Sequence, residues 1–145
     1  MEYKRIQGMP EGNDLKEILA FYQDIFRPEA NFLEEMKTKR NLVTFVALVD
    51  GDMVGFKMGY DRKENHFYSW LGGVSDFYRG QGVASELMKQ QHQWCREAGY
   101  HAIRTHTKNK WKAMLILNLR HGFDVIGTYT YVKGEPKIIL EKRLD

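Results

Sequence analysis

The residues best suited to chemistry lie in one basic, glycine-rich turn, Arg79-Gly80-Gln81-Gly82. The turn follows a β-type segment that ends near Val74, and it leads into a strongly periodic helical segment from Val83. The first N–H groups of a helix have no acceptor within the helix, and the helix dipole makes that end partly positive. Glycine lets the backbone approach a bulky anion, and Arg79 adds a charged donor. The pattern therefore predicts a phosphate or pyrophosphate site.

The turn differs from two better-known phosphate loops. No Gly-Lys-Ser or Gly-Lys-Thr is present, so the P-loop lysine and its magnesium-binding hydroxyl are missing. A dinucleotide-binding loop requires a third glycine where this chain has Ser85, and an acidic residue about 20 residues further on, whereas residues 100–107 contain none. Both classes are excluded.

The elements around the turn follow from hydrophobic spacing and turn residues. A helix capped by Asp14 and ended by Pro28 precedes a second helix near 30–40. Paired glycines at Gly72-Gly73 indicate a bulge or the close approach of another group. The order β-α-α-β-β-β-α-β-α-β-β predicts one mixed α/β (α+β) domain over 1–145, with a central, partly antiparallel sheet flanked by helices. The strands are expected at 3–7, 42–49, 53–61, 66–75, 100–107, 123–132 and 136–144, and the later helices at 83–98 and 110–121.

The pattern Arg79-x-x-Gly82-x-Ala84 after a strand resembles the acyl-CoA-binding motif of the GNAT family (GCN5-related N-acetyltransferases). The segment from Asn109 to Phe123 resembles the second block of that family, and the order of elements matches. The resemblance implies acetyl-CoA as cosubstrate, a strand at 66–75 that parts from the one at 100–107, and a main-chain contact of Val74 with the pantetheine arm and the thioester oxygen. The residues implied in cofactor binding are Val74, Arg79, Gly80, Gln81, Gly82, Val83, Ala84 and Asn109.

The candidate proton-transfer residues depart from the family's usual pattern. Trp70 stands where relatives often carry a glutamate, and Asn118 stands where many carry a tyrosine that protonates the departing thiolate. Because an amide cannot act as a general acid, Asn118 is interpreted as bonded to the backbone or as a contact of the cofactor or substrate. His106 is the best single candidate for a relay, since imidazole titrates near neutrality. The expected oxyanion donor is the backbone N–H of Val74.

Two further residues have ordinary alternatives. Asn109 could cap the helix that follows it. The family commonly has an asparagine here that touches the cofactor. Counting back from Gly122-Phe123, its position falls on Trp111, so the cofactor contact is assigned to Asn109, two residues earlier. Cys95 lies on the apolar face of its helix and is interpreted as core, so an acyl-cysteine intermediate is not expected. No histidine or cysteine cluster has metal-ligand spacing, and no metal is predicted.

Composition excludes several classes of function. The 145 residues are 43% apolar, and the net charge of +3 is spread along the chain, which argues against a nucleic-acid interface. No segment has the apolar length of a membrane span, and a signal core is not seen at the start. The single cysteine fits a reducing compartment, so a cytoplasmic protein with no membrane association is expected.

The sequence thus predicts an acetyl-CoA-dependent N-acetyltransferase that moves acetyl to a primary amine by direct attack in a ternary complex. The alternative is a non-catalytic acyl-CoA-binding sensor or regulatory module, which the missing glutamate and tyrosine favour slightly. The acceptor is a small-molecule or peptide amine whose identity stays open, with contacts expected from 14–40 and 127–132. A homodimer stays open as the assembly.

Overall fold

The computed structural model describes residues 1–25, 31–130 and 134–145, and its helices and strands follow the predicted order. One element is added, a short 3-10 turn, η1, directly after the fourth strand. Pro28, and residues 131–132 of the range expected to contact the acceptor, lie outside the described residues. The elements are β1 (Glu2–Gln7), α1 (Gly12–Ile25), α2 (Phe32–Thr38), β2 (Val43–Val49), β3 (Asp52–Lys63), β4 (His66–Val74), η1 (Asp76–Tyr78), α3 (Val83–Glu97), β5 (Ala102–Lys108), α4 (Lys112–Arg120), β6 (Asp124–Tyr129) and β7 (Lys137–Arg143).

The strands form a single sheet in the order β1-β2-β3-β4-β5-β7-β6. Every neighbouring pair is antiparallel except β4 and β5, which are parallel. The parallel pair needs a crossover connection, and α3 supplies it. The predicted mixed α/β fold with a partly antiparallel sheet is therefore confirmed.

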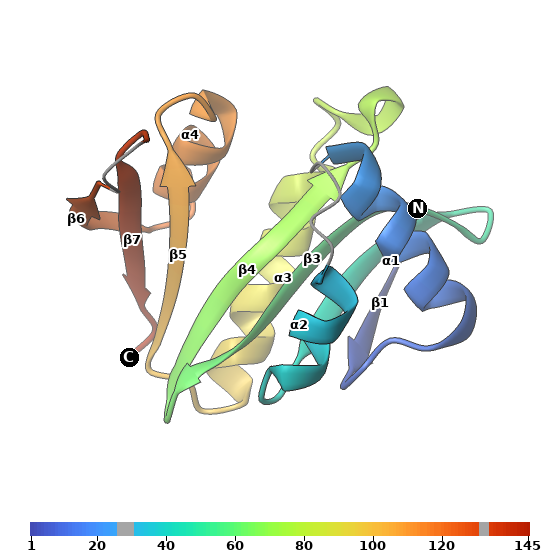
Figure 1. Cartoon of the computed structure of the whole chain (residues 1–145), viewed down its shortest axis with the longest axis horizontal. Coiled ribbons are helices and arrows are strands. Elements are labelled where there is room, and N and C mark those ends of the chain that lie inside the picture. The colour runs from blue at the N-terminus through green and yellow to red at the C-terminus, as the bar shows by residue number, and fades with distance from the viewer. Residues whose placement is uncertain (26–30, 131–133) are drawn as a thin grey trace.

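Helices cover both faces of the sheet (Figure 1). On one face α1 and α2 pack a core that includes Ile18 and Met36 against Phe56 of β3. On the other face α3 packs Leu87, Met88 and Cys95 into a second core, as its apolar spacing predicts. Close approach of α3 requires Gly55 on β3, because a Cβ there would lie 3.2 Å from Val83 Cγ1. Among the described residues, no helix is long and apolar enough to cross a membrane.

The bulge in β4 lies at Trp70 and not at the glycine pair. Met58 of β3 pairs with Leu71 and Gly59 pairs with Ser69, so Trp70 is the extra residue. The other expectation, that another group approaches the glycine pair closely, holds at Gly72. A Cβ there would lie 2.6 Å from the carbonyl oxygen of Phe56 on β3.

The first helix also differs at its start. It begins at Gly12, so Asp14 lies in its first turn and forms an ion pair with Lys4 (2.7 Å) rather than capping the helix. A carboxylate in the first turn still interacts favourably with the helix dipole.

Candidate active site

β4 and β5 lie side by side only at their beginnings. Parallel pairing joins residues 66–68 to residues 102–104. One more contact follows, in which Thr105 Oγ1 donates to the backbone oxygen of Ser69 over 2.9 Å. Beyond it the strands diverge, while β5 stays paired with β7 (Figure 1). The second half of β4 therefore has no strand on that side, and the predicted parting of the two strands is confirmed.

Val74 directs its backbone toward this opening. The Ser75 N–H donates to the Val54 oxygen over 2.9 Å, so ladder bonds flank the Gly55–Val74 pair rather than join it. In an antiparallel ladder such a pair points its N–H and C=O away from the partner strand. Since the pattern repeats every two residues, Gly72 does the same. Two successive backbone N–H groups of β4 thus face the opening.

The glycine turn follows directly. Gly80 and Gly82 have φ of 76° and 85°, and a Cβ on either would meet no protein atom within 4 Å. Gly82 is the N-cap of α3 and has no side-chain cap, and the first helical bond runs from the Glu86 N–H. The N–H groups before Glu86 in the first turn therefore have no helical acceptor. Open space beside the glycines and these N–H groups fit an anion.

Arg79 is held beside the turn. Its Nη1 lies 3.0 Å from Asp76 Oδ1, and its Nε donates to the Val74 oxygen over 3.1 Å. Gln81 is exposed, and its amide donates to the Phe77 oxygen over 2.9 Å. Val83 is buried and Ala84 half-buried against the α3 core, so these two can offer a ligand little beyond their backbone.

Asn109 is exposed in the turn between β5 and α4. The N-cap of α4 is Trp111, with no side-chain cap bond, so the capping alternative for Asn109 is wrong. Its contact with the cofactor stays a prediction. Trp111 is 42% exposed, with Lys108 Nζ 5.2 Å and Lys110 Nζ 5.5 Å from its ring centre.

Asn118 is a buried polar residue of α4, 3% exposed. Its backbone oxygen accepts from the N–H groups of His121 and Phe123, both at 3.1 Å, which closes the helix. Its side-chain amide has no hydrogen-bond partner within the described ranges. Of the two interpretations of this amide, backbone bonding is thus not observed, and contact with cofactor or substrate stays a prediction.

A pocket of about 350 Å³ opens on the α1/α2 side of the sheet, where β4 and β5 part. We call it the arginine pocket. Its volume falls at the small end of ligand sites. Tyr60 lies 5.4 Å from Trp70 and 5.5 Å from Tyr68, ring centre to ring centre, so aromatic side chains form much of the wall. The lining residues are Tyr60, Arg62, Tyr68, Trp70, Arg104 and His106.

His106 stands in this pocket with its ring 5.3 Å from that of Tyr68 and 6.0 Å from that of Tyr129. Burial lowers the pKa of His106, and the positive charges of Lys137, Arg104 and Arg62 lower it further. The imidazole is therefore neutral at pH 7, the form in which it can accept a proton.

The model of the Acetyltransferase (GNAT) family matches residues 13–123, well over half of the chain. The chain belongs to the GNAT family. Membership makes acyl transfer its reaction class.

Solved structures of other GNAT proteins share the fold. A putative acetyltransferase of the family from Desulfovibrio desulfuricans is 14% identical, with a TM-score of 0.82 over 99% of this chain and 100% of that one. The ribosomal-protein-S18-alanine N-acetyltransferase of Escherichia coli is 16% identical, with a TM-score of 0.80 over 97% and 94%. A putative streptothricin acetyltransferase from Bacillus anthracis, solved with acetyl coenzyme A, is 25% identical, with a TM-score of 0.70 over 81% and 70%. No protein of curated function matches significantly.

Trp70 has a structural role in this GNAT protein. Its ring lies 5.4 Å from that of Phe32 on α2, and Lys39 Nζ sits 5.1 Å from its centre. The residue thus ties β4 to α2 and walls the arginine pocket, and it supplies no proton acceptor there.

Sequence reasoning missed Arg62 and Arg104. Both lie on the same face as His106, and the alternation Arg104-x-His106 on one strand was a usable signal. Arg62 was not predictable, because it is the extra residue of a second bulge, between the Asp61–Phe67 and Lys63–His66 pairs. A second missed contact joins Ser85 Oγ of α3 to His121 Nε2 after α4, 2.8 Å apart, across the end of the opening.

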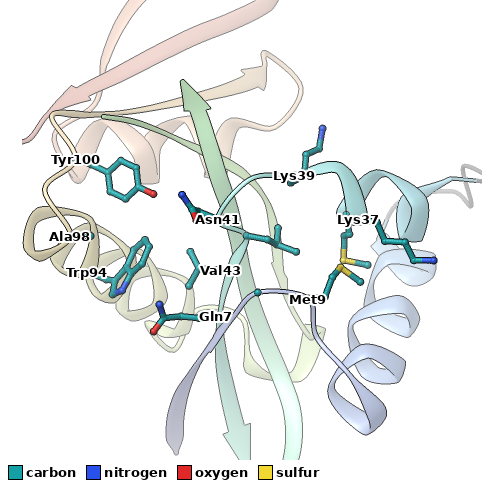
Figure 2. Close-up of a pocket in the computed structure, with 12 residues that line it drawn as sticks. Gln7, Met9, Lys37, Lys39, Asn41, Val43, Trp94, Ala98 and Tyr100 are labelled. Atoms are coloured by element: carbon teal, nitrogen blue, oxygen red, sulfur yellow. The ribbon is translucent and has the colours of Figure 1, made fainter. Parts of the chain in front are cut away.

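A second hollow, about 360 Å³, lies at the far end of α3. Figure 2 shows Asn41, Val43 and Tyr100 inside it, with Lys37 and Lys39 pointing outward. A helix of 15 residues spans roughly 22 Å, so the hollow is remote from the glycine turn. Asn41 and Tyr100 already bond to Asp61. This hollow is not the acyl-transfer site.

Proposed function

We propose that the protein transfers the acetyl group of acetyl-CoA to a primary amine by direct attack in a ternary complex. The observation that carries the proposal is the parting of β4 from β5, which leaves the N–H groups of Gly72 and Val74 facing an opening beside the glycine turn. The family match and the acetyl-CoA complex of the Bacillus anthracis relative support the choice of cosubstrate.

The two ends of the opening suit the two ends of such a cosubstrate. At the turn, Arg79 and the first N–H groups of α3 would bind the pyrophosphate, with Gly80 and Gly82 giving the backbone room to approach it. Asn109 would contact the cofactor from the turn before α4. Along β4, Gly72 and Val74 would pair with the amides of the pantetheine arm as a strand would.

Acetyl-CoA supplies an acyl group already activated as a thioester. In the proposed reaction the N–C bond forms, the C–S bond breaks, and sulfur leaves as a thiolate. Orientation of the two substrates can lower the barrier by roughly 7–11 kcal/mol. The Val74 N–H would donate to the developing oxyanion, a contact worth about 3 kcal/mol in comparable sites.

The amine must lose a proton before or during attack. Neutral His106 is the candidate acceptor, directly or through water, because it lines the arginine pocket beside the opening. Asn118 would hold the cofactor or substrate by a hydrogen bond, since an amide does not transfer protons near neutrality.

Two glycines give a matched test of cofactor binding. Gly82 and Gly99 both have positive φ, 85° and 90°, both have open space at Cβ, and they lie just outside opposite ends of α3. Gly82→Ala and Gly99→Ala should lose similar stability from backbone strain. Only Gly82→Ala should lose affinity for acetyl-CoA, by about tenfold or more, as calorimetry would measure. Equal affinities in the two variants would remove the turn from the site.

The second candidate, an acyl-CoA-binding sensor, draws on Trp70 and Asn118, which stand where many relatives carry the base and the acid. It predicts acetyl-CoA binding without thiol release. Turnover with amines of both kinds named for the structural relatives, protein amino termini and small molecules such as streptothricin, separates the two functions. A cytoplasmic location and a homodimer stay part of the proposal, to be tested by fractionation and by mass in solution.

A further inference from the structure

The charge in the arginine pocket is not balanced by the protein. Arg104 forms an ion pair with Glu141, at 3.1 Å from Nη2 and 3.3 Å from Nε to the same carboxylate oxygen. Arg62 has no such partner: its Nε is buried without a hydrogen bond, and no ion pair of Arg62 exists among the described residues. Lys39 Nζ also lies 4.7 Å from the ring centre of Tyr60 in the pocket wall, so positive charge is in excess there.

This positive charge lowers the pKa values of two neighbouring histidines. Burial lowers the pKa of His66, and Lys63, Arg62 and Arg104 lower it further against the opposing effect of Glu141. His106 responds in the same direction, with Arg104 and Arg62 among the causes. A buried N–H without an acceptor, such as Nε of the half-buried Arg62, is unfavourable unless a ligand satisfies it.

We propose that the arginine pocket binds an acceptor that carries a carboxylate in addition to its amine, with Arg62 and Arg104 as the carboxylate ligands. The inference rests on the proposed function, because it names the acceptor class of the same reaction. A guanidinium matches a carboxylate in shape and can donate to both of its oxygens. A carboxylate would also offset the positive charge that Arg62 brings without an acidic partner among the described residues.

The position of the pocket sets the length of the acceptor. Tyr68 lies four residues before Gly72 on β4, about 13 Å at the rise of a strand. A carboxylate at the Arg62 end of the pocket would thus lie well away from the N–H groups that face the opening, with His106 and Trp70 also lining the pocket. An α-amino acid, which has both groups on one carbon, is too short. An ω-amino acid or a short peptide with a carboxylate remote from its free amine fits.

The test compares amines that match in length. We expect 6-aminohexanoate to be acetylated with at least about tenfold higher kcat/KM than 6-aminohexanamide or 1,6-diaminohexane. Arg62→Gln should bring the three within about threefold of one another, and Arg62→Lys should be intermediate, because an ammonium keeps the charge and loses the paired donors. Lys63→Gln removes a charge from the adjacent exposed residue and should keep the preference. Thermal unfolding confirms that each variant is folded.

A binding measurement separates this inference from the reaction. Calorimetry with 6-acetamidohexanoate and 6-acetamidohexanamide needs no turnover. A carboxylate preference that Arg62→Gln abolishes, with no amine acetylated, would support the pocket and overturn the transferase. Acetylation without a carboxylate preference would support the transferase and overturn the pocket, as would equal binding of the two acetamides.

Discussion

At the scale of single residues, the candidate site relies on backbone donors more than on side chains. Trp70 is fixed by ring contacts to Phe32 and Tyr60, and Asn118 has no side-chain partner within the described part of the chain. The N–H groups of Gly72 and Val74 face the opening instead. Such a site can orient and polarise a thioester with little side-chain chemistry.

Asn118 gives a direct test of this arrangement. Because its amide has no hydrogen-bond partner to lose among the described residues, Asn118→Ala should change the free energy of unfolding by no more than about 1 kcal/mol. It should lower kcat/KM for acetyl-CoA by about tenfold, the value of one hydrogen bond to the ligand. The pH midpoint of turnover should not move, since an amide does not titrate there.

Two measurements decide the role of Asn118. Denaturant unfolding reports stability, and a pH–rate profile reports the titrating groups. A shifted midpoint would show that Asn118 tunes a titrating residue, and a large loss of stability with normal kinetics would make it a structural residue only. Cys95 stays outside the chemistry, because it is fully buried in the α3 core and burial raises the pKa of its thiol.

At the scale of elements, β4 sets the geometry of the site. Gly72 lets β4 lie close to β3, since a Cβ there would approach the Phe56 oxygen to 2.6 Å and Lys57 Cα to 3.2 Å. Both are backbone atoms, so a substitution must move the strand. Movement of β4 would displace Val74, two residues further on.

Gly72→Ala should therefore lose about 1–3 kcal/mol of stability and weaken acetyl-CoA binding as well. The matched control is Gly127→Ala on β6, where a Cβ would meet no atom within 4 Å and φ is not positive. Urea unfolding and calorimetry measure the two effects. If Gly72→Ala behaves like Gly127→Ala, the close approach of β3 and β4 does not position the site.

Elements and turn chemistry could be predicted from the sequence because they depend on local patterns. The periodic apolar face of α3 and the glycines at 80 and 82 signal a helix after a tight turn wherever they occur. Which side chains face the proposed acceptor pocket depends on how β3 and β4 pair, residue by residue. One extra residue at Trp70 re-aims the side chains of β4, and no local pattern marks a bulge at a tryptophan. Tyr60 pairs with Tyr68 beyond that bulge, and Arg62 is the extra residue of a second bulge between Asp61 and Lys63.

At the scale of the whole molecule, the two proposed substrate sites lie toward opposite faces of the sheet and meet at the opening. The N-terminus of α3, with the glycine turn before it, lies at one end of the opening (Figure 1). The arginine pocket lies on the α1/α2 side of the sheet. The proposed direct transfer needs both substrates bound at once, and this arrangement would give each its own entrance.

Buried bases beneath α3 determine how the fold responds to pH. His92 is 2% exposed, with Nδ1 2.9 Å from Lys142 Nζ and Nε2 buried without a partner. Burial, and then the charge of Lys142, lower its pKa to about 2. Burial likewise lowers the pKa of Lys57 to about 8. Lys57, His121 and Arg96 add positive charge around His92.

The free energy of unfolding should therefore rise with pH. Between pH 2 and about 6.5 the unfolded chain holds a proton on His92 that the folded chain does not, so acid favours unfolding by up to about 1.4 kcal/mol per pH unit. Between pH 8 and about 10.5, Lys57 likewise makes the free energy of unfolding rise with pH, because the unfolded chain holds a proton there that the folded chain has lost. Urea unfolding at pH 4 to 8 should show the acid loss in the wild type, a smaller loss in His92→Gln, and the wild-type loss in His101→Gln, which changes an exposed histidine. Equal acid losses in all three proteins would mean that His92 takes up a proton in the folded state, and that the cluster beneath α3 opens to water before the fold is lost.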